Sequence, residues 1–281
     1  MNINTSFINF KKIHKNKKNQ IIFHHVKFKN NKIIENIIDN FLLTKNSFIF
    51  ESVEKRRIRG RYTIIGGNPD KIWEFNKKKI YLIEGSNKKI IKKKPYIYLK
   101  EIIENFKFKM PRNIPSLSSL LVGYFSYDII RYIENISDKC IDDLKIPDIR
   151  LMRPKSLIIH DNDLKKIYFI QNCYEDEKIN NYSKYYLKLV KNISLMKKLA
   201  FKNKEPTKIK MPSRSKIIIK SNISKKEFTK NVIKAKKYIK NGDIFQVVLS
   251  QRFEAKLTKS PLEIYKKLRI TNPSPFMYFF N

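Results

Sequence analysis

Serine, glutamate and arginine side chains gather in one short stretch near the N-terminal third of the sequence. Glu51-Ser-Val-Glu54 is followed by Arg59-Gly-Arg61-Tyr62 at the start of a β-rich run. Arginine pairs with carboxylates through two parallel hydrogen bonds, so these groups could hold the carboxylate and amine of an amino acid. They could equally be surface charges of modest energetic worth. The pattern alone favours the surface interpretation.

Two prolines restrict the backbone in Asn272-Pro-Ser-Pro275. Each proline fixes one φ angle, so neighbouring polar groups would meet a ligand with little further ordering. A rigid turn between a helix and a strand is the equally weighted alternative.

The histidine and cysteine residues give little indication of a binding or metal site. His160 lies in a β-rich run without a companion ligand, so we expect a hydrogen-bonded histidine within a sheet. The only cysteines, Cys140 and Cys173, lie far apart and form no CxxC motif. They indicate neither a zinc site nor a disulfide framework, and a reducing cytosol fits them best.

Composition indicates a folded protein in spite of its high charge. The 281 residues are 42% hydrophobic and 12% aromatic, which is too apolar for a disordered chain, and their number suggests about two domains. The net charge of +36 comes from lysines scattered along every segment without a nucleic-acid-binding motif, so we expect no nucleic-acid partner. No apolar run approaches the ~20 residues of a membrane helix, and residues 1–20 lack the apolar core of a signal peptide. We therefore expect a cytoplasmic protein without a membrane partner.

Hydrophobic periodicity predicts the elements that position these residues. Helical spacing occurs at residues 31–43, 179–199, 225–240 and 260–268, the last two opening with Ser-x-x-Glu capping boxes at Ser224 and Ser260. A glycine at position 242 can end the third helix in the left-handed conformation. β-rich runs occur at residues 47–53, 61–66, 72–75, 79–84, 157–161, 166–170 and 244–253.

Turn signals divide the chain further. Gly66-Gly-Asn-Pro69 is expected to close one strand, and Asn162-Asp163 to form a hairpin turn. Residues 120–132 begin strand-like and become helical. The charged, proline-punctuated stretch 202–214 predicts a boundary. We expect an N-terminal region at 1–205, a linker at 206–222 and the start of a second domain at 223–281.

Four motifs, taken together, resemble the component I family of anthranilate synthases. Their order and spacing agree with that family between residues 51 and 277. They are Glu51-Ser-Val-Glu54 with Arg61-Tyr-Thr-Ile-Ile-Gly66, Leu121-Val-Gly-Tyr-Phe-Ser-Tyr-Asp128, Gly242-Asp-Ile-Phe-Gln-Val-Val-Leu-Ser-Gln-Arg252 and Asn272-Pro-Ser-Pro-Phe-Met277. The resemblance implies an α+β fold of antiparallel sheets flanked by helices, truncated within the chorismate-binding domain.

The resemblance also implies a reaction. It is the lyase step in which chorismate and ammonia, supplied by a glutamine amidotransferase subunit, give anthranilate and pyruvate at the start of tryptophan biosynthesis. The family's magnesium ligands and acid/base histidine lie beyond the position of Asn281. We therefore assign no catalytic or metal-binding residue within 1–281, and expect these residues alone to be inactive. Aminodeoxychorismate synthase component I and a non-catalytic remnant are the alternatives; Val247-Val-Leu-Ser250 and the complete Asn272-Pro-Ser-Pro275 favour anthranilate synthase.

A feedback-inhibitor site for tryptophan is also implied by the resemblance. By position its residues are Ser52, Pro275, Phe276 and Met277, with Arg61 a weaker candidate. Core packing is the alternative for Phe276 and Met277. Phe276 stands where the family has tyrosine, so one hydroxyl is lost and inhibitor affinity is expected to differ.

Side chains occupy several positions where the family has glycine. Ser119 and Leu120 stand before Leu121, and Lys55 and Arg56 follow Glu54. Glycine often serves where φ is positive, so we expect strain at these turns.

Overall fold

The computed structural model describes residues 2–29, 32–51, 60–77, 79–139, 141–202 and 217–281. The chain forms two compact units. One comprises residues 1–204 and 268–281, and the other comprises residues 205–267.

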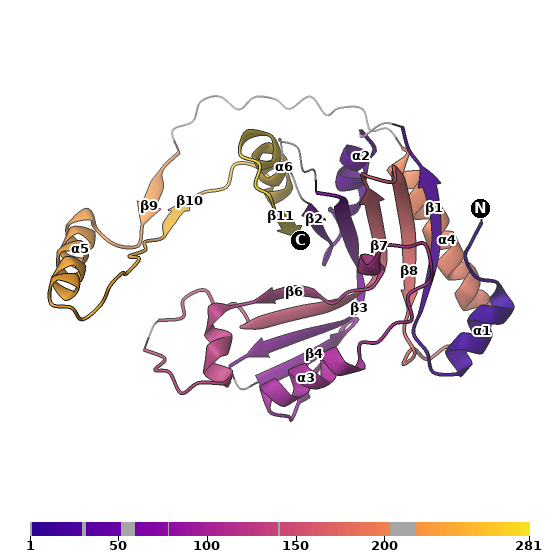
Figure 1. Cartoon of the computed structure of the whole chain (residues 1–281), viewed down its shortest axis with the longest axis horizontal. Coiled ribbons are helices and arrows are strands. Elements are labelled where there is room, and N and C mark those ends of the chain that lie inside the picture. Colours follow the sequence, from indigo (N-terminus) through magenta and orange to yellow (C-terminus); the bar gives the residue numbers. More distant parts are fainter. Residues whose placement is uncertain (1, 30–31, 52–59, 78, 140, 203–216) are drawn as a thin grey trace. The chain divides into compact units, whose positions relative to one another are not determined.

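An antiparallel sheet forms the centre of the first unit (Figure 1). Its main path runs β1-β8-β7-β3-β2-β11, and β4, β5 and β6 extend it beside β3 and β7. The strands are β1 (Gln20–Lys27), β2 (Phe48–Glu51), β3 (Tyr62–Asn76), β4 (Lys79–Glu84), β5 (Asn87–Ile91), β6 (Val122–Phe125), β7 (Ile149–Asp161), β8 (Lys166–Cys173) and β11 (Met277–Phe280). β7 and β8 form the expected hairpin, in register from Ser156↔Gln171 to Asp161↔Lys166.

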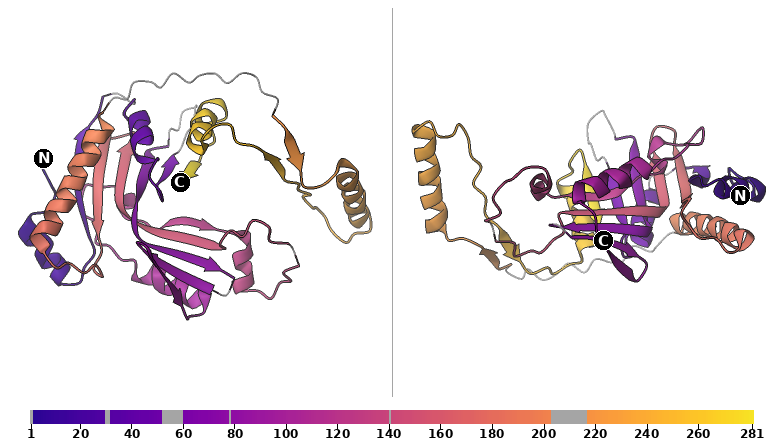
Figure 2. Two further views of the ribbon diagram at one scale, coloured as in Figure 1. Left: turned by 180° about the vertical axis from the view of Figure 1, so that it is seen from behind. Right: turned by 90° about the horizontal axis from the view of Figure 1, so that it is seen from below.

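Helices pack on this sheet in two places (Figure 2). α2 (Lys32–Phe41) and α4 (Tyr182–Ala200) contact each other, and α4 also contacts β8, β1 and α1 (Phe7–Lys15). α4 buries four side chains at helical spacing, Leu189, Ile193, Met196 and Ala200. α3 (Pro95–Asn105) places Ile102 in a separate core cluster with residues of β3, β4 and β7. Helices thus flank antiparallel strands, which confirms the predicted α+β class.

Short 3₁₀ segments border β6. η1 (Ser116–Ser118) precedes the strand, and η2 (Tyr127–Tyr132) follows it. The expected change from strand to helix across residues 120–132 is confirmed in this form. Val122 is buried in the main core cluster, with Leu157, Ile159 and Met152 of β7.

The prediction that Gly66-Gly-Asn-Pro69 ends a strand is wrong. β3 continues through it to Asn76, with a register shift against β7 between Pro69 and Lys71. A Cβ on Gly66 would come within 2.5 Å of both Leu157 Cδ2 and Phe48 Cζ. Glycine therefore permits close packing within the sheet here, and the irregularity accommodates the proline that a regular ladder would exclude.

The second unit contains β9 (Ile219–Ser221), α5 (Lys225–Lys240), β10 (Phe253–Ala255) and the start of α6 (Pro261–Thr271). The Ser224 hydroxyl accepts a hydrogen bond from the Glu227 amide at 3.1 Å, and Gly242 has φ of +78°, as the capping signals predict. Ser260 and Glu263 form the second predicted box, with Ser260 N donating to Glu263 Oε2 at 3.0 Å. The domain boundaries stay a prediction, because residues 206–216 of the proposed linker lie outside the described residues.

The predicted strand at 244–253 is wrong over most of its length. Only Phe253 enters a strand, β10, which pairs with β9. A stable strand needs a neighbouring strand to accept and donate its backbone hydrogen bonds, and a surface against which its apolar side chains can be buried. Within the described part of this unit β9 is a three-residue partner, and Phe245 and Val248 remain 101% and 82% exposed.

Candidate functional site

The end of β2 lies beside two other segments that the sequence assigns to a site. Glu51, the last residue of β2, pairs in register with Met277 of β11 and with Thr63 of β3. Ser52 follows Glu51 and lies outside the described residues, as do Lys55 and Arg56. Arg61 and Phe276 immediately precede β3 and β11 at this same end. Of the predicted site residues that the structure describes, Arg61, Phe276 and Met277 thus lie at one end of three neighbouring strands.

The two prolines connect a helix to a strand, as the alternative interpretation of this motif expects. α6 ends at Thr271 and β11 begins at Met277. Phe276 is 83% exposed, so core packing is wrong for this ring. Met277 is half-buried and Pro275 is exposed. An exposed aromatic ring beside a rigid turn is a surface suited to stacking against a flat ligand.

Arg61 pairs with a buried carboxylate of its own chain. Its Nη2 donates to Asp161 Oδ2 at 3.0 Å and its Nε to Oδ1 at 3.2 Å. The Asp161 side chain has no exposed surface and also accepts from the amides of Asp163 and Leu164. Burial alone would raise the pKa of Asp161, but these hydrogen bonds hold it below its usual value. Arg61 therefore anchors the β7–β8 hairpin, which weakens its candidacy as a ligand for an inhibitor carboxylate.

Arg269 forms a second ion-pair cluster at this end, which the sequence reasoning missed. Its Nε donates to Glu51 Oε1 at 2.6 Å, and its Nη1 to Glu35 Oε1 at 2.6 Å. Burial alone would lower the pKa of Arg269, but the two carboxylates raise it above the ordinary value. The partners lie 218 and 234 residues away in sequence, so no local spacing could have revealed them.

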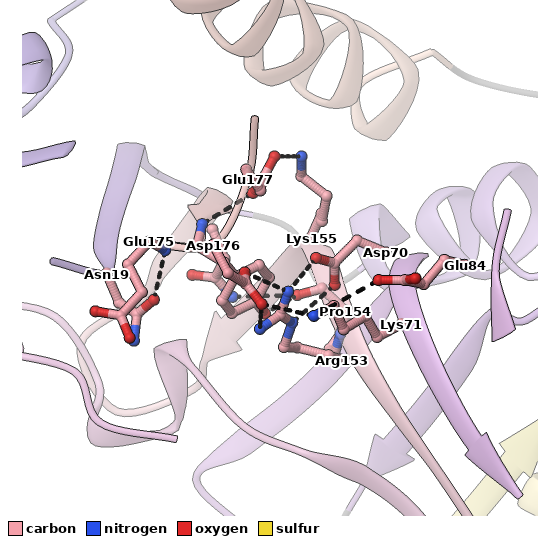
Figure 3. A network of polar contacts seen from close by, with 12 residues as sticks. Asn19, Asp70, Lys71, Glu84, Arg153, Pro154, Lys155, Glu175, Asp176 and Glu177 are labelled. Carbon is pink, nitrogen blue, oxygen red and sulfur yellow. Dashed lines mark hydrogen bonds and ion pairs between the residues drawn. The ribbon is translucent and has the colours of Figure 1, made fainter. Parts of the chain in front are cut away.

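A larger polar network holds the irregular part of β3 (Figure 3). Arg153 on β7 pairs with Asp70 of β3 and, at 2.8 Å, with Asp176 beyond β8. Lys71 joins it through Asp176 at 2.6 Å and Glu84 at 3.6 Å. The guanidinium of Arg153 also lies 3.8 Å from the centre of the Tyr174 ring. These groups satisfy one another, and we assign the network a structural role.

Two expectations about single residues need correction. His160 lies in β7 and is 2% exposed, but neither ring nitrogen has a hydrogen-bond partner within the described structure. Its ring instead packs 4.2 Å from that of Phe28, centre to centre, and burial lowers its pKa to about 4. Ser119 has an extended backbone and Leu120 has no positive φ, so the strain expected there is absent.

Over its described ranges the chain holds no group of three or more His, Cys, Asp or Glu side chains that could bind a metal ion. The same residues include no helix long and apolar enough to cross a membrane.

The chain matches a known family of enzymes. A model of the chorismate binding enzyme family matches residues 45–281, so the chain belongs to this family. It is 34% identical to anthranilate synthase component 1 of Acetivibrio thermocellus over 238 residues, which are 83% of this chain and 48% of that protein.

Two further comparisons agree with this family. The chain is 36% identical to anthranilate synthase component 1 of Aquifex aeolicus over 66% of this chain and 37% of that protein. The crystal structure of anthranilate synthase component I from Streptococcus pneumoniae TIGR4 superposes with a TM-score of 0.62 at 28% identity, covering 79% of this chain and 48% of that one. The chain spans about half the length of the curated relatives it matches.

Proposed function

We propose that the native protein acts as component I of an anthranilate synthase and converts chorismate and ammonia to anthranilate and pyruvate. The observation that carries this proposal is the similarity to proteins of that name over 83% of the chain. The four motifs between residues 51 and 277 support it. The same relatives favour this reaction over that of aminodeoxychorismate synthase.

The proposed reaction takes place in the cytoplasm with a glutamine amidotransferase subunit as the ammonia source. Magnesium would supply Lewis-acid assistance at the substrate carboxylate. We propose that the ligands of this ion lie outside residues 1–281; the described residues hold no cluster of three or more side chains that could bind a metal.

The reaction is tested on the native protein purified from its own source, with any sequence beyond Asn281 included. Chorismate, magnesium and ammonium should yield fluorescent anthranilate together with pyruvate. Formation of aminodeoxychorismate in its place would support the alternative enzyme, and no product would support the remnant. A polypeptide of residues 1–281 alone should form no anthranilate, and turnover above background would contradict that expectation.

We propose further that tryptophan inhibits the enzyme by binding at the end of β2, β3 and β11. Ser52, Pro275, Phe276 and Met277 would contact it, with Arg61 as the weakest candidate. The exposure of Phe276 and the pairing of Met277 with Glu51 support this placement.

A substitution at Ser52 tests the inhibitor site. Ser52→Leu should abolish tryptophan binding in calorimetry while uninhibited turnover persists, because leucine removes a hydroxyl and fills space in the pocket. Ser183→Leu, at an exposed position of α4, is the matched control and should bind as the unmodified protein does. Unchanged affinity in Ser52→Leu would remove Ser52 from the site.

A further inference from the structure

The segment between α6 and β11 is fastened at both ends to one residue, Glu51. At its start, Arg269 donates to the Glu51 carboxylate at 2.6 Å. At its end, Met277 pairs with Glu51 in the antiparallel ladder of β11 and β2. Residues 270–276, which are the last two residues of α6 and the connection to β11, are therefore held at one end by an ion pair and at the other by strand pairing. This segment carries Pro275 and Phe276.

The ion pair that holds this segment is well shielded from water. The Glu51 side chain is 2% exposed and the Arg269 side chain 16% exposed. Arg269 also binds Glu35 of α2, whose side chain is 53% exposed. Charge-assisted hydrogen bonds of this length are strong, and a guanidinium can bridge two carboxylates in a fixed orientation. Arg269, near the C-terminal end of α6, thus connects this end of the helix to β2 and α2 through its two ion pairs.

We infer that Arg269 is a positioning residue for the tryptophan site, an inference that rests on the proposed function. It fixes residues 270–276 so that Pro275, Phe276 and Met277 are held beside the end of β2 at Glu51. It acts through this geometry rather than by touching the inhibitor. A segment that is already ordered binds with less loss of conformational entropy, so loosening it weakens binding.

The experiment compares Arg269→Gln and Arg269→Lys with the unmodified native protein. Hydrogen exchange measures the order of the backbone amides within residues 270–276, where Pro273 and Pro275 have no N–H, and calorimetry measures tryptophan affinity. Arg269→Gln should speed exchange in this segment and weaken affinity by about tenfold, as expected when a few residues must be ordered on binding. Arg269→Lys should have an exchange rate and a tryptophan affinity between those of Arg269→Gln and the unmodified protein, since a point charge cannot bridge both carboxylates in the same way.

Two further variants separate positioning from general stability. Arg153→Gln also removes a buried arginine that binds two carboxylates, but it lies in the network around β3, so tryptophan affinity should not change. If Arg269→Gln alone unfolds, the double variant Glu51→Gln with Arg269→Gln takes its place, because it leaves no unpaired charge buried at this position. The double variant should fold and still show faster exchange and weaker binding.

The outcomes distinguish the two proposals. If the unmodified protein binds no tryptophan, the proposed inhibitor site is wrong and the inference falls with it. If that protein binds and folded Arg269 variants bind equally well, the positioning role is wrong while the inhibitor site stands. Unchanged exchange at 270–276 would likewise overturn the positioning role. Equal loss of affinity in Arg153→Gln would show a general effect of stability and overturn it too.

Discussion

Replacement of Gly123 by alanine should strongly destabilise the first unit. A Cβ on Gly123 would coincide closely with the carbonyl oxygen of Arg150 and lie 2.8 Å from its carbonyl carbon and 2.9 Å from Leu151 Cα. These are backbone atoms of β7, the strand paired with β6. No rotamer change can relieve the overlap, so β6 must move away from β7.

The cost follows from what β6 loses when it moves. Val122, which is 2% exposed, would give up burial worth about 1.5–3 kcal/mol. One or two backbone hydrogen bonds would add about 1 kcal/mol each. Alanine offsets about 0.4–1 kcal/mol by restricting the unfolded chain. We therefore expect a loss of about 1.5–4.5 kcal/mol, a large share of the stability of about 5–15 kcal/mol typical of natural proteins.

The assay is urea unfolding followed by the fluorescence of Trp73, the single tryptophan, which is 6% exposed and lies in a core cluster with Leu151. Gly67→Ala is the control, because its Cβ would meet Ser47 Cα at an acceptable 3.4 Å. The control should change the free energy of unfolding by less than about 1 kcal/mol. Equal midpoints for Gly123→Ala and the unmodified chain, or an equal loss in Gly67→Ala, would refute the reasoning.

Two further predictions concern pH and the second unit. Burial lowers the pKa of His160 from its ordinary value of 6.5 to about 4. Between pH 6.5 and pH 4 the unfolded state therefore binds more protons than the folded state. The free energy of unfolding should fall as the pH falls through this window, by up to about 3 kcal/mol. His160→Phe should remove this part of the pH dependence in unfolding titrations, and an unchanged slope would contradict it. The double variant Phe245→Ser with Val248→Thr should reduce self-association in sedimentation experiments, because two exposed apolar groups close together in sequence promote contacts between molecules. Ile8→Thr, which changes a single exposed apolar residue, should leave self-association unchanged. Equal association in all three proteins would show that this surface is not responsible.

Local signals were sufficient to predict several elements. The capping boxes at Ser224 and Ser260 place their helices, and the Asn162-Asp163 turn places a hairpin, because each depends on residues a few positions apart. β1 was missed for a physical reason. Its first four residues, Gln20 to Phe23, are all buried, so the alternation typical of a half-exposed strand is lost.

Long-range features could not be predicted from local patterns. The run at 244–253 has the composition of a strand, yet a strand also depends on partners that local patterns do not contain. The pairing of Met277 with Glu51 and the ion pair of Arg269 join segments more than 200 residues apart. The resemblance to a family brought Ser52 and Met277 into one predicted site, but it gave no indication of the ion pair between Arg269 and Glu51.

The most direct test of the account is the anthranilate fluorescence formed by the native protein as tryptophan is added. With chorismate, magnesium and ammonium present, we predict anthranilate formation that tryptophan suppresses, and the same formation without suppression in Ser52→Leu. Absence of anthranilate from the folded native protein would contradict the proposed reaction. Formation that tryptophan leaves unchanged would contradict the inhibitor site at the end of β2.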